Sequence, residues 1–178
     1  MIEIALAIAV IAIGMVSIMG LFPIGLSANK DAMAKSYAAE SADEFLHYLE
    51  RYLREDWATD YSNAAYIPAT EPADADKADF SVTVSGTQLT PSLYLSNSDN
   101  GVYKAIRYLD DDGDGQYDSG EIVDFEAIVA VWREQIDIDG SSLAYDYGLK
   151  LVMEISWPAK VPYASRSKDE YVLELFNR

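Results

Sequence analysis

The sequence predicts an α+β fold, in which one long N-terminal helix packs on a C-terminal antiparallel β-sheet. Three patterns in the 178 residues lead to this prediction: an uncharged run near the N-terminus, an amphipathic stretch directly after it, and separate β-branched and aromatic runs in the second half of the chain. The length suits one such unit rather than two independent domains. We divide the chain into an apolar helix half (1–26), an amphipathic helix half (27–57), a surface loop (58–78) and a β domain (79–178).

The apolar half contains 23 uncharged residues, from Ile4 to Leu26. As a helix this run would reach about 34 Å, at a rise of about 1.5 Å per residue, which is enough to span a bilayer. A cleaved secretory signal would show a basic start and a shorter apolar run, whereas the first basic residue here is Lys30. The run therefore predicts a membrane-spanning helix, and not a cleaved signal.

Some residues in this half weaken a helix. Proline removes a backbone donor, and each glycine costs up to about 1 kcal/mol relative to alanine. We therefore expect a kink or a melted stretch around Gly14, Gly20, Pro23 and Gly25. The alanines and glycines of the same run would let such helices pack closely, although an ordinary membrane anchor would explain them nearly as well.

Glu3 places a carboxylate at the leading edge of the apolar run. Burying an unpaired charge costs several kcal/mol, so a partner is expected. The cation that packed helices would bring nearest is the N-terminal ammonium, at Met1, of a neighbouring copy, and the helix dipole also favours a glutamate near the N-terminus. The alternative is that the carboxylate reaches the headgroup region without a partner.

The amphipathic half continues the helix with one apolar stripe. Its apolar residues recur at spacings of three and four, as expected for a helix with one buried face. The stripe consists of Ala34, Ala38, Ala42, Phe45, Leu49 and Leu53. Because little interrupts the chain between the two halves, we predict a single helix from about residue 3 to residue 56.

After the helix, residues 58–78 are rich in Ala, Asp and Pro and predict a surface loop. Alternation of Phe80, Val82 and Val84 with polar residues predicts the first strand. Four further runs predict the other strands: Val102–Leu109, Ile122–Val131, Leu149–Trp157 and Tyr171–Phe176. Pro158 ends the fourth of these five strands, and a loop to Lys168 leads into the last one.

The run DDDGDGQYDSGE, residues 110–121, matches the key positions of an EF-hand-type calcium loop. Carboxylates two residues apart converge on one ion only if the chain winds around it, and Gly115 permits the sharp turn. The expected ligands are Asp110, Asp112, Asp114, the backbone carbonyl of Gln116, Asp118 and a bidentate Glu121. A solvated acidic turn is the alternative. Because the flanking residues read as strands, we expect a static calcium clamp rather than a switch.

Composition argues against several classes of function. With 30 acidic and 13 basic residues the net charge is −17, so direct binding to nucleic acid or to anionic headgroups is not expected. The chain has no cysteine, which rules out disulfides, thiolate metal sites and a cysteine nucleophile. His47 is the only histidine, and no phosphate-binding glycine loop occurs. An enzyme is therefore not expected.

The N-terminal run MIEIALAIAVIAIG resembles the start of type IV pilins and pseudopilins. The resemblance implies a pilin-like lollipop fold, with the apolar half as filament core and the amphipathic half packed on the β domain. It also implies that a prepilin peptidase cuts a basic leader and methylates the new N-terminus, and that Glu3 neutralises the amine of an adjacent subunit. Glu3 stands a couple of positions earlier than in the family, so either Met1 is not the mature N-terminus or further residues precede it. The lack of a leader fits a mature chain.

Together these features predict a structural subunit of an extracellular, cell-surface type IV pilus-like filament, which polymerises through its N-terminal helix and is stabilised by calcium. Its expected partners are further copies of itself, the inner membrane before assembly, and the pilus or secretion assembly machinery. Two alternatives remain: a minor pseudopilin of a type II secretion-like or uptake machine, and a membrane-tethered calcium-dependent adhesion module.

Overall fold

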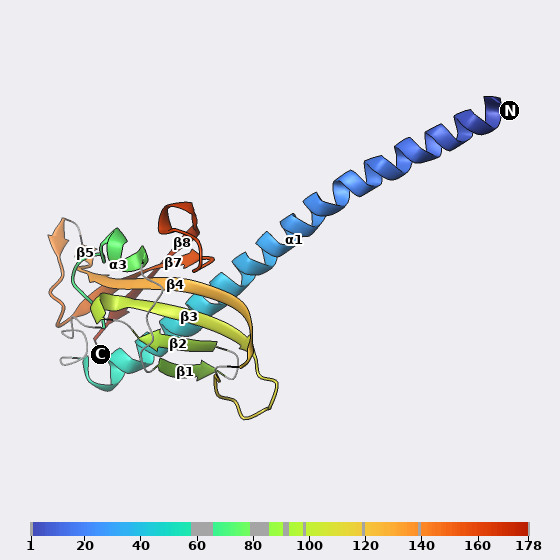
Figure 1. Ribbon diagram of the computed structural model, residues 1–178. Helices are drawn as coiled ribbons and strands as arrows, with labels where there is room; N and C mark the ends of the chain where they lie inside the picture. The colour runs from blue at the N-terminus through green and yellow to red at the C-terminus, as the bar shows by residue number, and fades with distance from the viewer. Residues whose placement is uncertain are drawn as a thin grey trace. The chain divides into compact units, whose positions relative to one another are not determined.

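The computed structural model describes residues 2–57, 66–78, 86–90, 93–97, 99–118, 120–138 and 140–177. It contains one long helix, α1 (Ile2–Glu55), and a six-stranded antiparallel sheet of order β1-β2-β3-β4-β7-β8 (Figure 1). The predicted α+β class is therefore confirmed. The chain falls into two units, residues 1–36 and residues 37–178, and α1 runs through both.

The large sheet is built from strands of 5 to 13 residues. They are β1 (Gly86–Thr90), β2 (Leu93–Asn97), β3 (Val102–Leu109), β4 (Ile122–Glu134), β7 (Gly148–Trp157) and β8 (Ser167–Phe176). The smaller elements are α3 (Asp74–Ala78), the strand pair β5 (Asp137–Ile138) and β6 (Ser141–Ser142), and the 3₁₀ turns η1 (Asp99–Gly101) and η2 (Tyr163–Ser165).

In the first unit α1 is not interrupted. It remains helical through Gly14, Gly20, Pro23 and Gly25, so the expected melted stretch is wrong. A proline removes one backbone N–H from the ladder, whereas the residues on either side of it keep theirs, and long helical flanks hold it in place.

In the second unit, α1 packs on one face of the sheet through the predicted stripe (Figure 1). From Ala38 to Leu53 all five stripe residues are at most 3% exposed, while Ala34 is only half-buried. The Phe45 ring meets the Tyr103 ring edge-on, with 4.9 Å between centroids. Arg107 on β3 forms an ion pair with Glu40 at 3.1 Å. The amphipathic half therefore belongs to the core of the sheet unit.

Four of the five predicted strands are present, as β3, β4, β7 and β8. β4 runs three residues further than predicted, to Glu134, and β8 begins earlier, at Ser167, after the turn η2. The strands β1 and β2 were not predicted. The predicted strand at Phe80, Val82 and Val84 lies outside the described residues. Within the predicted loop 58–78, the described part contains the short helix α3.

Candidate functional site

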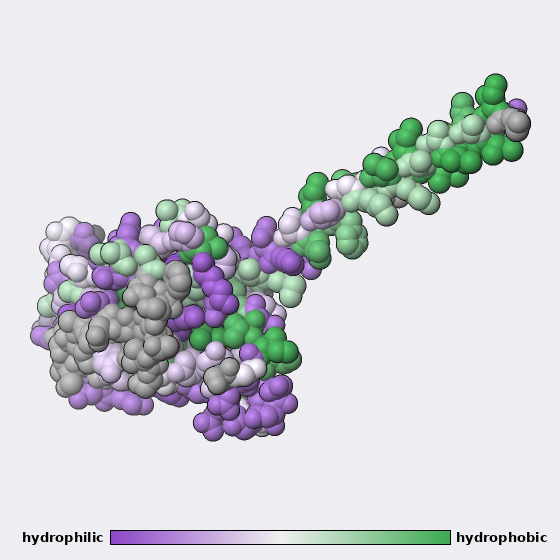
Figure 2. Space-filling view, in the orientation of Figure 1, coloured by the Kyte–Doolittle hydropathy of each residue, from purple (hydrophilic) through white to green (hydrophobic). Residues whose placement is uncertain are grey.

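The first candidate site is the surface of α1 in the first unit. Apart from Glu3, residues 2–26 carry no charge, and the large apolar side chains described there are between 49% and 83% exposed. Figure 2 shows this half of the helix as an almost unbroken hydrophobic surface. Among the described residues, α1 is the one helix long and apolar enough to cross a membrane.

Glu3 lies in the first turn of α1, where its carboxylate is favoured by the helix dipole. Its side chain is exposed within the chain, like the apolar residues around it. Met1, the other residue expected to take part in assembly, lies outside the described residues.

The second candidate site is the acidic loop between β3 and β4. These strands pair up to Leu109 and Ile122, so the loop closes a long antiparallel hairpin. Carboxylate oxygens of Asp110, Asp112 and Asp114 lie within 4.8 Å of one another. These are three of the five carboxylates that the loop pattern was expected to bring together.

Backbone amides hold these carboxylates in place. Asp110 accepts hydrogen bonds from the amides of Gly113, at 2.7 Å, and Gly115, at 2.9 Å. The amide of Gln116 donates to Asp114 Oδ1 at 2.7 Å. Gly113 and Gly115 have φ angles of 78° and 76°, which side chains disfavour, so the glycines allow the winding. The loop thus turns its carboxylates inward without any lysine or arginine.

Asp118 and Glu121 are not part of this group of three. The Asp118 amide donates to Glu121 Oε2 at 3.0 Å, which ties the two to each other. Partial burial raises the pKa of Glu121, the bond from Asp118 opposes this, and the charges of Asp110, Asp111 and Asp112 raise it further. The structure therefore brings together three of the five expected carboxylate ligands. Three carboxylates could hold a hard cation, although exposed acidic groups commonly gather without one.

Tyr117 anchors the acidic loop to the sheet, which the sequence did not predict. Its ring lies 5.1 Å from that of Tyr94 and 5.2 Å from that of Tyr108, between centroids. Gln88 Nε2 donates to the Tyr108 hydroxyl at 2.6 Å. Burial raises the pKa of both Tyr108 and Tyr117, and nearby carboxylates add to the effect. The loop is therefore supported by strands β1, β2 and β3.

The two candidate sites call for different kinds of partner. The apolar half of α1 needs a surface that covers it, and the acidic loop can hold a cation. Comparison of the chain with models of known protein families, with curated proteins and with solved structures found no match in any of the three.

Proposed function

We propose that this chain is a non-enzymatic structural subunit of an extracellular filament of the type IV pilus kind, anchored in the inner membrane before assembly. The observation that supports this most strongly is the exposed apolar half of α1, which carries a single carboxylate at its leading end. A lone exposed surface of this extent has to be covered by lipid or by other protein.

The size of the apolar surface suits this role. Burying one Val, Leu, Ile, Met or Phe side chain contributes about 1.5–3 kcal/mol, so covering the exposed ones along residues 2–26 contributes on the order of tens of kcal/mol. Lipid covers such a helix in the membrane, and identical helices around a filament axis cover it after extraction. Self-assembly therefore replaces one apolar environment by another.

Glu3 favours assembly over passive anchoring. A plain anchor gains nothing from a carboxylate at the edge of its apolar run, because the charge must stay solvated. Between packed copies, the same carboxylate can neutralise the N-terminal ammonium of a neighbour. The glutamate then fixes the axial register of adjacent subunits.

Immunogold electron microscopy of sheared extracellular filaments, with an antibody against the sheet unit, tests this function. A principal subunit should be labelled along the whole filament length. Labelling confined to filament ends would favour the minor-pseudopilin alternative. Gold on the cell surface but none on filaments, together with monomers in detergent, would contradict the proposal and favour a tethered calcium-dependent module.

We further propose that residues 110–121 bind calcium as a static clamp. The support is the cluster of Asp110, Asp112 and Asp114, which carries several negative charges in a small volume with no lysine or arginine in the loop. Such carboxylates repel one another, and a divalent cation would remove that repulsion. An ion held there would fasten the far end of the β3–β4 hairpin.

Removing calcium is expected to lower the melting temperature of the full-length protein. At a free concentration one hundred times the dissociation constant, a ligand stabilises the folded state by about 2.7 kcal/mol. Asp112→Asn should abolish the calcium-dependent shift, while Asp111→Asn, which changes a neighbouring carboxylate outside the group of three, should retain it. Calorimetry with calcium and with a chelator measures both. Terbium luminescence gives a second readout because Tyr117 lies within the loop and can sensitise it. Equal melting with and without chelator would contradict the clamp.

A further inference from the structure

Three charged side chains are buried in the part of the chain that the structure describes, and all three are cations. Lys77, Arg166 and Arg133 are 1%, 6% and 9% exposed. The chain has 30 acidic and only 13 basic residues, so composition alone would not predict that the buried charged residues are all basic. Buried charge is costly unless it is fully bonded, so the partners show what the three residues do. All three take part in the attachment of one segment, residues 66–78, which we name the strap: Lys77 belongs to it, and Arg133 and Arg166 donate to its carbonyls.

The first half of the strap is fixed at the edge of the sheet where β3 begins and β4 ends. The Arg133 guanidinium donates to the carbonyl of Ile67, and the Arg133 amide donates to the carbonyl of Pro68 at 2.9 Å. Gly101 lets the strap pass, because a Cβ there would lie 2.5 Å from the Pro68 ring. The Tyr103 hydroxyl donates to the carbonyl of Tyr66 at 2.9 Å.

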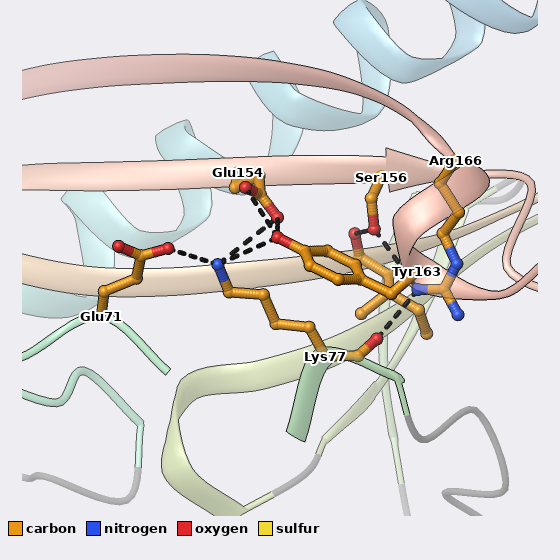
Figure 3. Close-up of polar contacts among 7 residues, drawn as sticks. Glu71, Lys77, Glu154, Ser156, Tyr163 and Arg166 are labelled. Carbon is orange, nitrogen blue, oxygen red and sulfur yellow. Dashed lines mark hydrogen bonds and ion pairs between the residues drawn. The ribbon is translucent and has the colours of Figure 1, made fainter. Parts of the chain in front are cut away.

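The second half of the strap is fixed by the ammonium of Lys77 on α3 (Figure 3). This ammonium lies 2.5 Å from Glu71 Oε1, 3.3 Å from the Tyr163 hydroxyl and 3.5 Å from Glu154 Oε1. It also lies 5.6 Å from the centroid of the Trp132 ring. Glu71 belongs to the strap, whereas Glu154 and Tyr163 belong to the sheet unit beneath, so Lys77 joins the two.

Arg166 fixes the second half of the strap through a separate set of hydrogen bonds. Its NH1 donates to the carbonyl of Lys77 at 2.9 Å (Figure 3). Its Nε and NH2 donate to the carbonyls of Val161 and Ala159. The guanidinium thus connects α3 to the segment between β7 and β8. Its NH1 also lies 3.4 Å from Ser156 Oγ on β7, so the same guanidinium contacts both the strap and the sheet.

The strap covers an apolar face of the sheet. Register places Val102 opposite Ala130, and Trp132 opposite Val152, on the same face as Glu154. The opposite face carries Tyr103, which contacts α1. Trp132, whose ring lies next to the Lys77 ammonium, belongs to one buried apolar cluster: Val102, Ile128, Ala130, Trp132, Val152 and Ala159.

The strap is held differently from the sheet that it covers. It has one helix of five residues and no strand, so its attachment depends on bonds between side chains and carbonyls, on the Lys77 ion pairs and on the burial of Ile67. β7 beneath it is paired along its length with β8 and along much of it with β4. Segments with few regular backbone bonds open at lower free energy than fully paired strands. Because breaking one attachment leaves a buried cation short of partners, the attachments should break together.

We propose that residues 66–78 are a latched strap that opens as one unit while the sheet stays folded, and that opening exposes Lys77 together with the apolar cluster. This inference does not depend on the filament or calcium proposals. Burial works against the charge on Lys77, but Glu71, Tyr163 and Glu154 outweigh it and raise its pKa, so the latch is charged at neutral pH.

Amine labelling of the full-length protein in a non-ionic detergent tests the proposal. Reductive methylation, followed by peptide mass spectrometry, gives the labelling rates of Lys77 and of Lys160, whose side chain is 79% exposed. Hydrogen exchange of the β7 amides gives the opening of the sheet on the same sample. We expect Lys77 to be labelled at least about tenfold more slowly than Lys160. We also expect the opening that exposes Lys77 to occur more often than the opening that lets the β7 amides exchange.

A matched pair of variants tests the latch itself. Glu154→Gln keeps the shape of the side chain but removes the charge beside Lys77, and should speed labelling of Lys77 by about tenfold. Glu174→Gln makes the same change at an exposed carboxylate further along β8, opposite Lys150, and should leave the rate unchanged.

Two results would overturn the strap. Labelling of Lys77 as fast as that of Lys160 would mean that the segment is not closed. The experiment is repeated at several denaturant concentrations. If the labelling rate of Lys77 changes in parallel with the exchange rate of the β7 amides at every concentration, the strap does not open separately from the sheet. Lysine labelling and amide exchange are both measured on the chain without substitutions, so the proposal can be tested even if a variant fails to fold.

Discussion

Replacing Glu3 by glutamine is expected to leave the chain in the membrane and to abolish its incorporation into filaments. The amide is close to the carboxylate in size and can still form hydrogen bonds, so insertion should not change. It carries no charge, however, and in a packed apolar core each neighbouring ammonium would then lack its counter-charge. An uncompensated buried charge costs several kcal/mol, and the cost recurs at every subunit.

Asp31→Asn is the matched control, because it removes an exposed carboxylate from the same helix beyond the apolar run. Membrane fractionation measures insertion, and quantitative blotting of sheared filaments measures incorporation. Normal filaments from Glu3→Gln would contradict the assembly role. Equal loss from both variants would mean that overall charge matters and that the position of Glu3 does not.

The helix and most of the sheet could be predicted because their signals are local. The stripe of Ala38, Ala42, Phe45, Leu49 and Leu53 has the helical period, and it is buried as predicted. The single helix was predicted as well, but the melted stretch expected around Pro23 is absent, since one missing donor does not unwind a helix with long flanks on both sides. The strands β1 and β2 have five residues each and little alternation, so pairing decides them: β2 pairs with β3, and β1 pairs with β2.

The acidic loop could be predicted from the sequence, whereas the strap could not, again because only the signal of the loop is local. Regular spacing in one short run predicted that Asp110, Asp112 and Asp114 would meet. The strap depends on partners far apart in sequence: Arg133 reaches Ile67 across 66 residues, and Arg166 reaches Lys77 across 89. Composition assigns lysine and arginine to the surface. Only the assembled sheet shows that these cations are buried and what they bind.

Replacing Phe45 by alanine is expected to destabilise the sheet unit by about 3–5 kcal/mol, which is a large share of the stability of a typical domain. Phe45 is 1% exposed, and its ring packs edge-on against Tyr103 at 4.9 Å with 69° between the planes. The change removes this ring contact and leaves a cavity between α1 and the sheet, which the neighbouring strands fill only in part. The amphipathic half of α1 would then lose much of its attachment.

Urea unfolding of the full-length chain in detergent, followed by fluorescence of the three tryptophans, measures the change. Phe176→Ala is the control, since it makes the same substitution at a ring that is 49% exposed, and it should shift the midpoint far less. A similar small shift for both variants would show that residues 37–55 are dispensable for the stability of the sheet. A large shift for Phe45→Ala alone would mean that the part of α1 around Phe45 belongs to the sheet unit, so that any boundary between anchor and domain lies before Phe45, in agreement with a second unit that begins at Tyr37.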